Sequence, residues 1–326
     1  MSTISDLFPS GISDILKKAL SFKLKLVCEH YLSRTIKRTL VAQSIMQFRK
    51  PKLLITTHDP GPSALPFVYS AKNLKIPTVV LLHGFHDPNF GAKHVSDYII
   101  VWGRLIKERF RKALKIPPAR IFNLGYPFLD SFFNNKKAFW QQPAKKLVFH
   151  IPFRLGLLVT IYPPDTFALS QFIQEIFAEI SSQKSDIEIW LRTHPGQSID
   201  KIEPLSRYFN VKILYNQPIS IEKFVDSCDA VMSWDTTAIL WPLLCGKPLF
   251  YTTPWWGPGH MHIEEFGAAW SPSSAHDLIK KITLALSRGE FTRTQRQNQQ
   301  RFLAGALGVI DGTSSEKHLA LFKKLI

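Results

Sequence analysis

Hydrophobic and polar positions follow two alternating patterns in the first part of the chain. Short apolar runs bounded by polar or turn-forming residues predict buried strands, and they lie at 52–57, 78–82, 98–102 and 120–124. The segments between them at 63–73 and 104–115 have the spacing of amphipathic helices. Strands that alternate with helices pair in parallel, so this part of the chain predicts a doubly wound α/β sheet.

The same alternation returns after a break. Residues 134–146 are polar and basic and include Pro143, which is typical of a linker between domains. Further strands are predicted at 146–151, 187–191, 211–215, 230–232 and 248–252, and further helices at 165–182, 236–244 and 275–287. Residues 152–164 are predicted to form a long connection. We therefore expect two domains, 1–138 and 145–326.

A basic helical segment is expected over residues 1–50. Apolar residues recur there at helical spacing, and lysines stand among or just after them: Ile12, Ile15, Leu16 and Leu20, with Lys17, Lys18, Lys23 and Lys25. Two interpretations fit this pattern. The segment lies on a membrane as a basic amphipathic helix, or it packs its apolar side on the sheet and exposes its lysines to water.

The net charge of the chain limits the classes of binding partner that we expect. The 326 residues carry a formal net charge of +16, which favours an anionic partner such as nucleic acid, a membrane surface or an acidic substrate. The sequence has no nucleic-acid-binding signature that we recognise, so we expect a phosphate-bearing substrate and an anionic membrane surface rather than nucleic acid. The three cysteines lack metal-site spacing. We expect neither a signal peptide nor a membrane-spanning run, so the predicted location is cytoplasmic, either free or peripheral on the inner face of the membrane.

Two strand ends carry polar residues suited to a phosphate. The strand at 230–232 is followed by Ser233 and then by Thr236 and Thr237, which open a helix that stops at Gly246. Free N–H groups and the positive dipole end at such a helix start attract a phosphate. Arg192 ends the strand at 187–191 and either reaches that phosphate or pairs with a carboxylate. The alternative is an ordinary βαβ unit with a well-capped helix.

The two segments together, LRTHP and DAVMSWDTTAILWPLLCGKP, resemble the C-terminal domain of GT-B glycosyltransferases. The similarity is greatest to a bacterial group with CDP-glycerol glycerophosphotransferases and capsule sialyl- and Kdo-type transferases. In that group a His-Pro motif and a paired hydroxyl motif hold the donor phosphate. The resemblance implies that His194 and Pro195 act there together with Thr236 and Thr237. Where relatives often carry a ribose-binding Glu, this chain has Trp241.

The first half resembles the later part of a GT-B N-terminal domain. The match covers residues 52–130, with a His83-Gly84 strand edge, a basic helix and a Gly125-Tyr126-Pro127 turn followed by Asp130. The opening strand and Gly-rich loop of most GT-B proteins are missing. The expected fold class is therefore α/β and GT-B-like, with two doubly wound Rossmann-like domains, of which the N-terminal one is either reduced or truncated.

Candidate catalytic residues follow from the same resemblance. His83 stands where a His of the glycerophosphotransferase-like relatives is proposed to act, and its pKa range suits deprotonation of an acceptor hydroxyl. Asp59 and His58, one strand over, are rival bases, and His194 would stabilise the leaving nucleotide. The alternative is that these histidines are structural. No histidine pair has zinc-site spacing and no Asp-x-Asp occurs, so we expect neither a metal nor a cofactor.

The resemblance implies a metal-independent glycosyltransferase or glycerophosphotransferase-like enzyme. It would use a nucleotide-activated donor and a glycan or lipid-linked acceptor in the biosynthesis of a surface polysaccharide, such as capsule or lipopolysaccharide, or of a glycolipid. One alternative is a UDP-sugar 2-epimerase. Such an enzyme is expected to have a His-x-x-Glu-Asn stretch, and the residues that begin at His194 do not form one. Another is a degenerate, non-catalytic GT-B partner subunit, which Trp241 and the short N-terminal domain favour.

Overall fold

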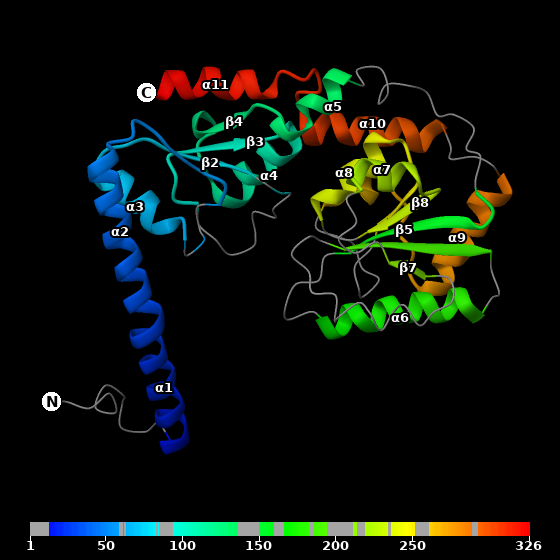
Figure 1. Ribbon diagram of the computed structural model, residues 1–326, viewed down its shortest axis with the longest axis horizontal. Helices are drawn as coiled ribbons and strands as arrows, with labels where there is room; N and C mark the ends of the chain where they lie inside the picture. Colours follow the sequence, from blue (N-terminus) through cyan, green and yellow to red (C-terminus); the bar gives the residue numbers. More distant parts are fainter. Residues whose placement is uncertain are drawn as a thin grey trace.

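The computed structural model describes residues 13–58, 61, 63–82, 84, 94–135, 150–159, 166–182, 186–193, 211–213, 219–233, 236–251, 261–288 and 293–326. These residues form two parallel β-sheets, each with helices on its faces, in two units that stand beside one another (Figure 1).

The first sheet is built from consecutive strands in sequential order. It comprises β1 (Leu54–Thr56), β2 (Thr78–Leu81), β3 (Tyr98–Val101) and β4 (Ile121–Asn123), ordered β1-β2-β3-β4 and all parallel, as predicted. Because the order never reverses, right-handed crossovers place the connecting helices on one face. These are α3 (Leu65–Asn73) and α4 (Arg104–Leu114), and the C-terminal helix α11 (Ser314–Leu325) lies over the opposite face (Figure 1).

The second sheet has the doubly wound order. Its strands are β5 (Phe153–Val159), β6 (Ile187–Thr193), β7 (Val211–Ile213), β8 (Ala230–Ser233) and β9 (Leu249–Tyr251), ordered β7-β6-β5-β8-β9 and all parallel. Helices α6 (Thr166–Ser182) and α9 (Ala275–Arg288) share a core on one face. Helices α7 (Ile221–Asp226) and α8 (Leu240–Leu244) pack on the other. The chain's order reverses between β5 and β8, which makes that gap the topological switch point.

The position predicted for the first strand of this sheet is wrong. A strand was expected over 146–151 and a connection over 152–164, whereas β5 occupies Phe153–Val159 and 146–149 lie outside the described residues. Arg154 and Gly156 interrupt the apolar run, so the pattern looks like a loop. In the structure the Arg154 guanidinium lies 5.0 Å from the Trp190 ring centroid. Gly156 is needed because a Cβ there would lie 2.6 Å from the Cys228 Sγ.

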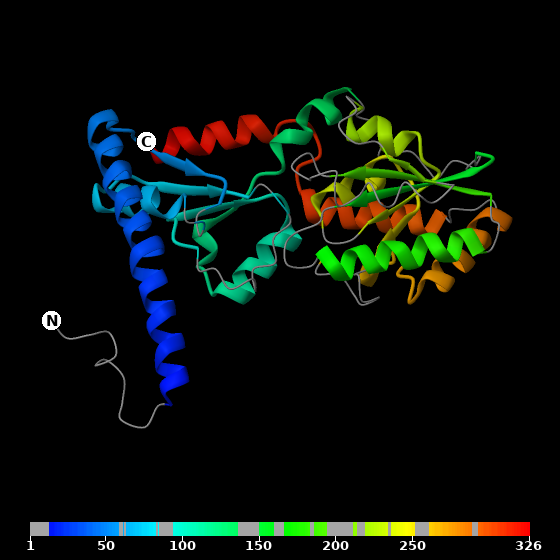
Figure 2. The ribbon, with the colours of Figure 1, turned by 60° about the horizontal axis from the view of Figure 1, so that its bottom comes forward.

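A long helical rod precedes the first sheet. Helix α1 (Asp14–Leu26), the π-helical turn η2 (Val27–Leu32) and α2 (Ser33–Arg49) follow one another without a break and project away from the sheet (Figures 1 and 2). Helix α2 packs against α3 and buries Ala42 and Met46, whereas α1 buries no residue. The interpretation that the first apolar segment packs on the sheet is therefore wrong for α1. In the described parts of the chain, no helix combines the length and apolarity needed to cross a bilayer.

Helix α10 (Arg293–Leu307) joins the two units by packing on α4 and on α8. Gly103, just before α4, lies against the backbone carbonyls of Gly305 and Ala306, an approach that leaves no room for a side chain. The buried Arg296 donates to the Leu243 carbonyl at 2.6 Å near the end of α8, where the same oxygen accepts from the Gly246 N–H at 3.2 Å. Short 3₁₀ turns lie at η3 (Pro118–Arg120), η4 (Pro127–Leu129), η7 (Thr237–Ile239) and η8 (Glu264–Phe266).

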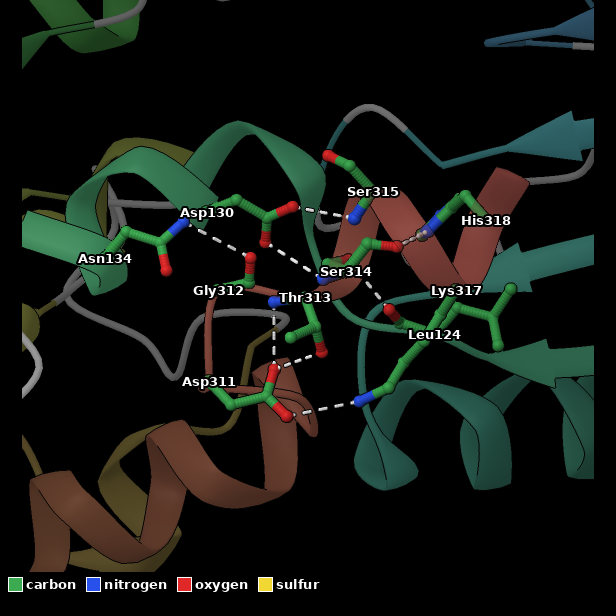
Figure 3. A network of polar contacts seen from close by, with 10 residues as sticks. All are labelled: Leu124, Asp130, Asn134, Asp311, Gly312, Thr313, Ser314, Ser315, Lys317 and His318. Atoms are coloured by element: carbon green, nitrogen blue, oxygen red, sulfur yellow. Dashed lines mark hydrogen bonds and ion pairs between the residues drawn. The ribbon is translucent and has the colours of Figure 1, made fainter. Parts of the chain in front are cut away.

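The C-terminal helix returns to the first sheet and is capped from another element. Asp130, the first residue of α5 (Asp130–Asn135), accepts from the backbone N–H groups of Ser314 (3.1 Å) and Ser315 (2.7 Å) (Figure 3). The Ser314 hydroxyl donates to the Leu124 carbonyl at 2.7 Å. Burial lowers the pKa of His318, whose Nδ1 lies 2.7 Å from the Ser314 carbonyl oxygen. The Gly125-Tyr126-Pro127…Asp130 segment therefore holds α11.

Replacing Asp130 with Ala is expected to lower the free energy of unfolding by about 1–2 kcal/mol, because two N–H groups at the start of α11 lose their acceptor. Amide hydrogen exchange should rise in α11 before it rises elsewhere. Denaturant unfolding and exchange measured together check this. Asp130→Asn is the matched control and should retain part of the stability, because one acceptor oxygen remains. Unchanged protection of α11 in Asp130→Ala would contradict the capping role.

Candidate functional site

The carboxyl ends of both sheets lie at the junction of the two units. Trp102 follows β3, and it belongs to one hydrophobic cluster with Leu158 and Tyr251 from the ends of β5 and β9. Arg109 of α4 donates to the Met261 carbonyl at 3.0 Å, which ties the chain after β9 to the first unit. Ligands of open α/β sheets bind outside the carboxyl ends of the strands, so this junction is the candidate site.

Three residues stand level across the switch point. Leu158 of β5 pairs with Arg192 of β6 on one side and with Ser233 of β8 on the other. Directly paired residues point to the same face of a sheet, and the buried Leu158 lies in the core shared with α7 and α8. The structure therefore places Arg192 and Ser233, both predicted donor-binding residues, at one edge on one face, with a single strand between them.

Ser233 and Arg192 both bind the backbone there. Ser233 is fully buried, and its hydroxyl donates to the Leu158 carbonyl at 3.3 Å. The Arg192 guanidinium donates to the Ile219 carbonyl at 2.6 Å and lies 6.0 Å from the Phe224 ring centroid. Burial lowers the pKa of Arg192. These contacts are with a backbone carbonyl and an aromatic ring, and the role of Arg192 in donor binding stays a prediction.

The paired threonines open the helical segment after β8. Thr236 is the N-cap of η7, and its Oγ1 accepts from the Ala238 N–H at 3.3 Å. A hydroxyl that accepts in this way still has its own proton to donate. Thr237 is the first residue of η7, and both threonines are half-buried. The predicted hydroxyl start of a helix beside the switch point is therefore present, and phosphate binding by it stays a prediction.

Four predicted site residues lie outside the described part of the chain: Asp59, His83, His194 and Pro195. His58 is described and is exposed. The catalytic roles expected for Asp59, His83 and His194 therefore stay predictions. Within the described ranges no group of three or more His, Cys, Asp or Glu residues has the arrangement of a metal site.

Trp241 has a structural partner. Its indole meets the Phe132 ring of α5 edge-on, with ring centroids 5.5 Å apart, and Phe132 is buried. The residue at the position where the resembling enzymes often carry a ribose-binding Glu thus packs one unit against the other. A ribose bound here would need another partner.

Sequence reasoning missed several residues that shape the junction. Tyr251 is fully buried and its hydroxyl accepts from the Met261 N–H at 3.1 Å. On the first sheet, Tyr126 stacks on Trp102 with ring centroids 4.0 Å apart, and the Trp102 indole N–H donates to the Leu82 carbonyl at 2.8 Å. Burial raises the pKa of Tyr126. The only sequence signal was the position of these aromatic residues at or just after predicted strands.

No protein-family model and no curated protein sequence matches this chain. Solved structures do match it in fold. A UDP-GlcNAc 2-epimerase from Neisseria meningitidis, bound to UDP-GlcNAc, is 14% identical with a TM-score of 0.63, and the match covers 89% of this chain and 81% of that one. A UDP-GlcNAc 2-epimerase from Methanocaldococcus jannaschii, in complex with UDP-GlcNAc and UDP, is 15% identical with a TM-score of 0.59, covering 88% and 80%.

A variant of the wall teichoic acid polymerase TagF matches less closely, at 14% identity and a TM-score of 0.51, covering 84% of this chain and 74% of that one. Identities this low show the fold alone. Together with the two parallel sheets and their flanking helices, the likeness confirms the expected fold class: the chain is an α/β protein of two Rossmann-like domains with the GT-B architecture.

Proposed function

We propose that the chain is an enzyme that binds a nucleotide-activated sugar at the junction of its two domains, with the donor phosphate beside the start of η7. The observation that supports this most directly is the switch point between β5 and β8, where β8 ends at Ser233 and the Thr236-capped helical segment follows. A strand end at a switch point followed by a helix start with hydroxyl side chains is suited to a phosphate.

A UDP-sugar 2-epimerase is the candidate that the fold comparison favours. The 2-epimerase structures reach TM-scores of 0.59 and 0.63 and align over most of both chains, and they hold UDP or UDP-GlcNAc. In this reading the nucleotide sugar is the whole substrate. It would bind across the junction, and no second substrate would be required.

A glycosyltransferase or glycerophosphotransferase-like enzyme is the second candidate, and a sequence observation supports it. After His194 the chain continues Pro195-Gly196-Gln197, which lacks the His-x-x-Glu-Asn stretch expected of a 2-epimerase. A transferase would pass the activated group from the nucleotide to an acceptor hydroxyl, and the nucleotide would be the leaving group.

One experiment separates these candidates. The protein is incubated with UDP-GlcNAc, CDP-glycerol and a CMP-activated acidic sugar, and products are followed by NMR and by release of free nucleotide. A 2-epimer formed without a second substrate supports the epimerase, whereas nucleotide release that depends on an added acceptor supports the transferase. Nucleotide binding without turnover would instead support the non-catalytic partner subunit.

Replacing Thr236 and Thr237 together with Val is expected to weaken nucleotide binding by about 1–3 kcal/mol, because hydroxyl donors to a charged phosphate are lost while side-chain shape is kept. Calorimetry with CMP, CDP and UDP measures it. Thr313→Val, which alters a helix start in the first unit, is the matched control and should leave binding unchanged. If the double variant binds its nucleotide as tightly as the parent, the phosphate does not lie at this helix start.

A further inference from the structure

The helical rod of α1, η2 and α2 carries most of the large hydrophobic side chains that are exposed in the described part of the chain. Of the 21 large hydrophobic side chains exposed among the described residues, 13 lie between Ile15 and Phe48. Ile15, Phe22 and Phe48 are 83%, 69% and 80% exposed. Scattered exposed apolar residues are normal, but a concentration on one element marks a surface that binds another surface.

The same rod is strongly basic. Residues 13–49 contain eight Lys or Arg and two acidic residues, which gives a net charge of +6. The described ion pair within it, Lys25 with Glu29 at 3.9 Å, is exposed on both sides and neutralises little. Exposed Phe and Ile side chains next to many lysines are complementary to a surface that has an anionic outer layer and an apolar interior.

A groove beside the rod combines the same two chemistries. It lies between α2 and α3, has a volume of 330 Å³ and is lined by Lys37, Arg38, Val41, Ser63 and Phe67. Cationic groups at the rim next to apolar walls suit a phosphate group attached to a hydrocarbon chain.

We propose that the rod of residues 13–49 binds the protein to an anionic lipid bilayer surface. Its apolar side chains would enter the boundary between headgroups and acyl chains, and its lysines would contact the headgroup phosphates. A second copy of the chain fits less well, because two rods with a net charge of +6 each would bring like charges together. The proposal concerns attachment only and does not depend on the reaction that the enzyme catalyses.

The test is cosedimentation of the full chain with vesicles. Vesicles of phosphatidylcholine mixed with phosphatidylglycerol should bind the protein at low ionic strength, whereas pure phosphatidylcholine should bind it at least about tenfold more weakly. Binding should fall as salt is raised from about 50 mM to about 500 mM, because surface charges are then screened. Equal binding to the two kinds of vesicle would overturn the proposal.

Two variants of α1 resolve the two contributions. Replacing Lys17, Lys18, Lys23 and Lys25 with Gln should reduce the partition constant by about a hundredfold or more, given the contribution of each basic residue near an anionic surface. Replacing Ile15 and Phe22, which are seven residues apart and share a helix face, with Ser should reduce it by at least about tenfold. Because α1 buries no residue, neither variant should alter thermal unfolding.

Matched controls keep the same charge and apolar losses elsewhere. Lys112, Lys280, Lys323 and Lys324, all exposed, are replaced with Gln in one control, and Phe128 and Leu319 with Ser in the other. A control that lowers binding as much as its α1 counterpart would show that attachment is not made by the rod. Sedimentation velocity without vesicles adds a last outcome: a dimer that dissociates in Ile15→Ser, Phe22→Ser would assign the rod to self-association and overturn the proposal. Nucleotide calorimetry in parallel shows separately whether the proposed function holds.

Discussion

Replacing Gly103 with Ala is expected to lower the free energy of unfolding by about 3 kcal/mol, among the largest effects for a single methyl group. The added Cβ would lie well inside contact distance of the carbonyl oxygens of Gly305 and Ala306. Both are backbone atoms of a helix, so neither can rotate away. The extended backbone of Gly103 (φ −145°) suits any residue, and the cost therefore comes from the contact between α4 and α10 alone.

Gly305→Ala is the matched control on the other side of the same contact. A Cβ there would meet the Cδ1 and Cγ of the Leu105 side chain at 2.7 and 2.8 Å, so this side chain must shift, whereas Ala improves helix propensity by about 1 kcal/mol. Its net effect should be smaller than that of Gly103→Ala, because a side chain can move where a helix backbone cannot. Denaturant unfolding of both variants, with hydrogen exchange of α4 and α10, measures the difference. Equal stability of Gly103→Ala and the parent would show that the two domains are not packed this closely in solution.

His83→Ala is expected to lower turnover by roughly 10²–10⁴-fold and to leave donor affinity nearly unchanged, if His83 is the general base of a transferase. A base acts on the acceptor hydroxyl, which is not part of the donor complex. His194→Ala should weaken donor binding and turnover together, because it is expected to contact the donor phosphate. The donor dissociation constant and kcat of both variants test this once the substrate panel has identified a donor.

Asp59→Asn is the third variant in this series, because Asp59 is the alternative candidate for the general base. Full turnover in His83→Ala with a loss in Asp59→Asn would move the base to Asp59. If the chain is an epimerase, its reaction involves no acceptor hydroxyl. The prediction that His83→Ala lowers turnover without changing donor affinity would then no longer apply. Full activity in both histidine variants would place the chemistry away from these strand ends.

Sequence periodicity predicted most elements because each depends on neighbours in the chain. The strands of the first sheet and the helix at Leu65–Asn73 follow directly from their apolar spacing. Periodicity did not predict the strand at Phe153–Val159, because a Gly and an Arg interrupt its apolar residues. Gly156 is explained by its contact with Cys228, far away in sequence, and no local pattern contains that contact.

The candidate site shows the same division. The hydroxyl start of a helix at Thr236 is local and was predicted, because an N-cap bonds to the backbone two residues on. Arg192 and Ser233 both pair with Leu158 of β5, one on each side of that strand. This arrangement depends on strand order and register, which are set by pairing between distant segments. The placement of β5 between them makes this edge the switch point.

The fold class, the alternation of strands and helices, the net charge and the residue types at the strand ends could all be predicted from the amino-acid sequence. These properties follow from side-chain chemistry and spacing within one segment. Three further features became visible only in the folded chain: Trp241 packs on Phe132, Asp130 caps α11, and α1 buries none of its residues. Each of these features depends on which surfaces meet when separate segments pack. The spacing of residues within one segment does not specify which distant segment it will contact.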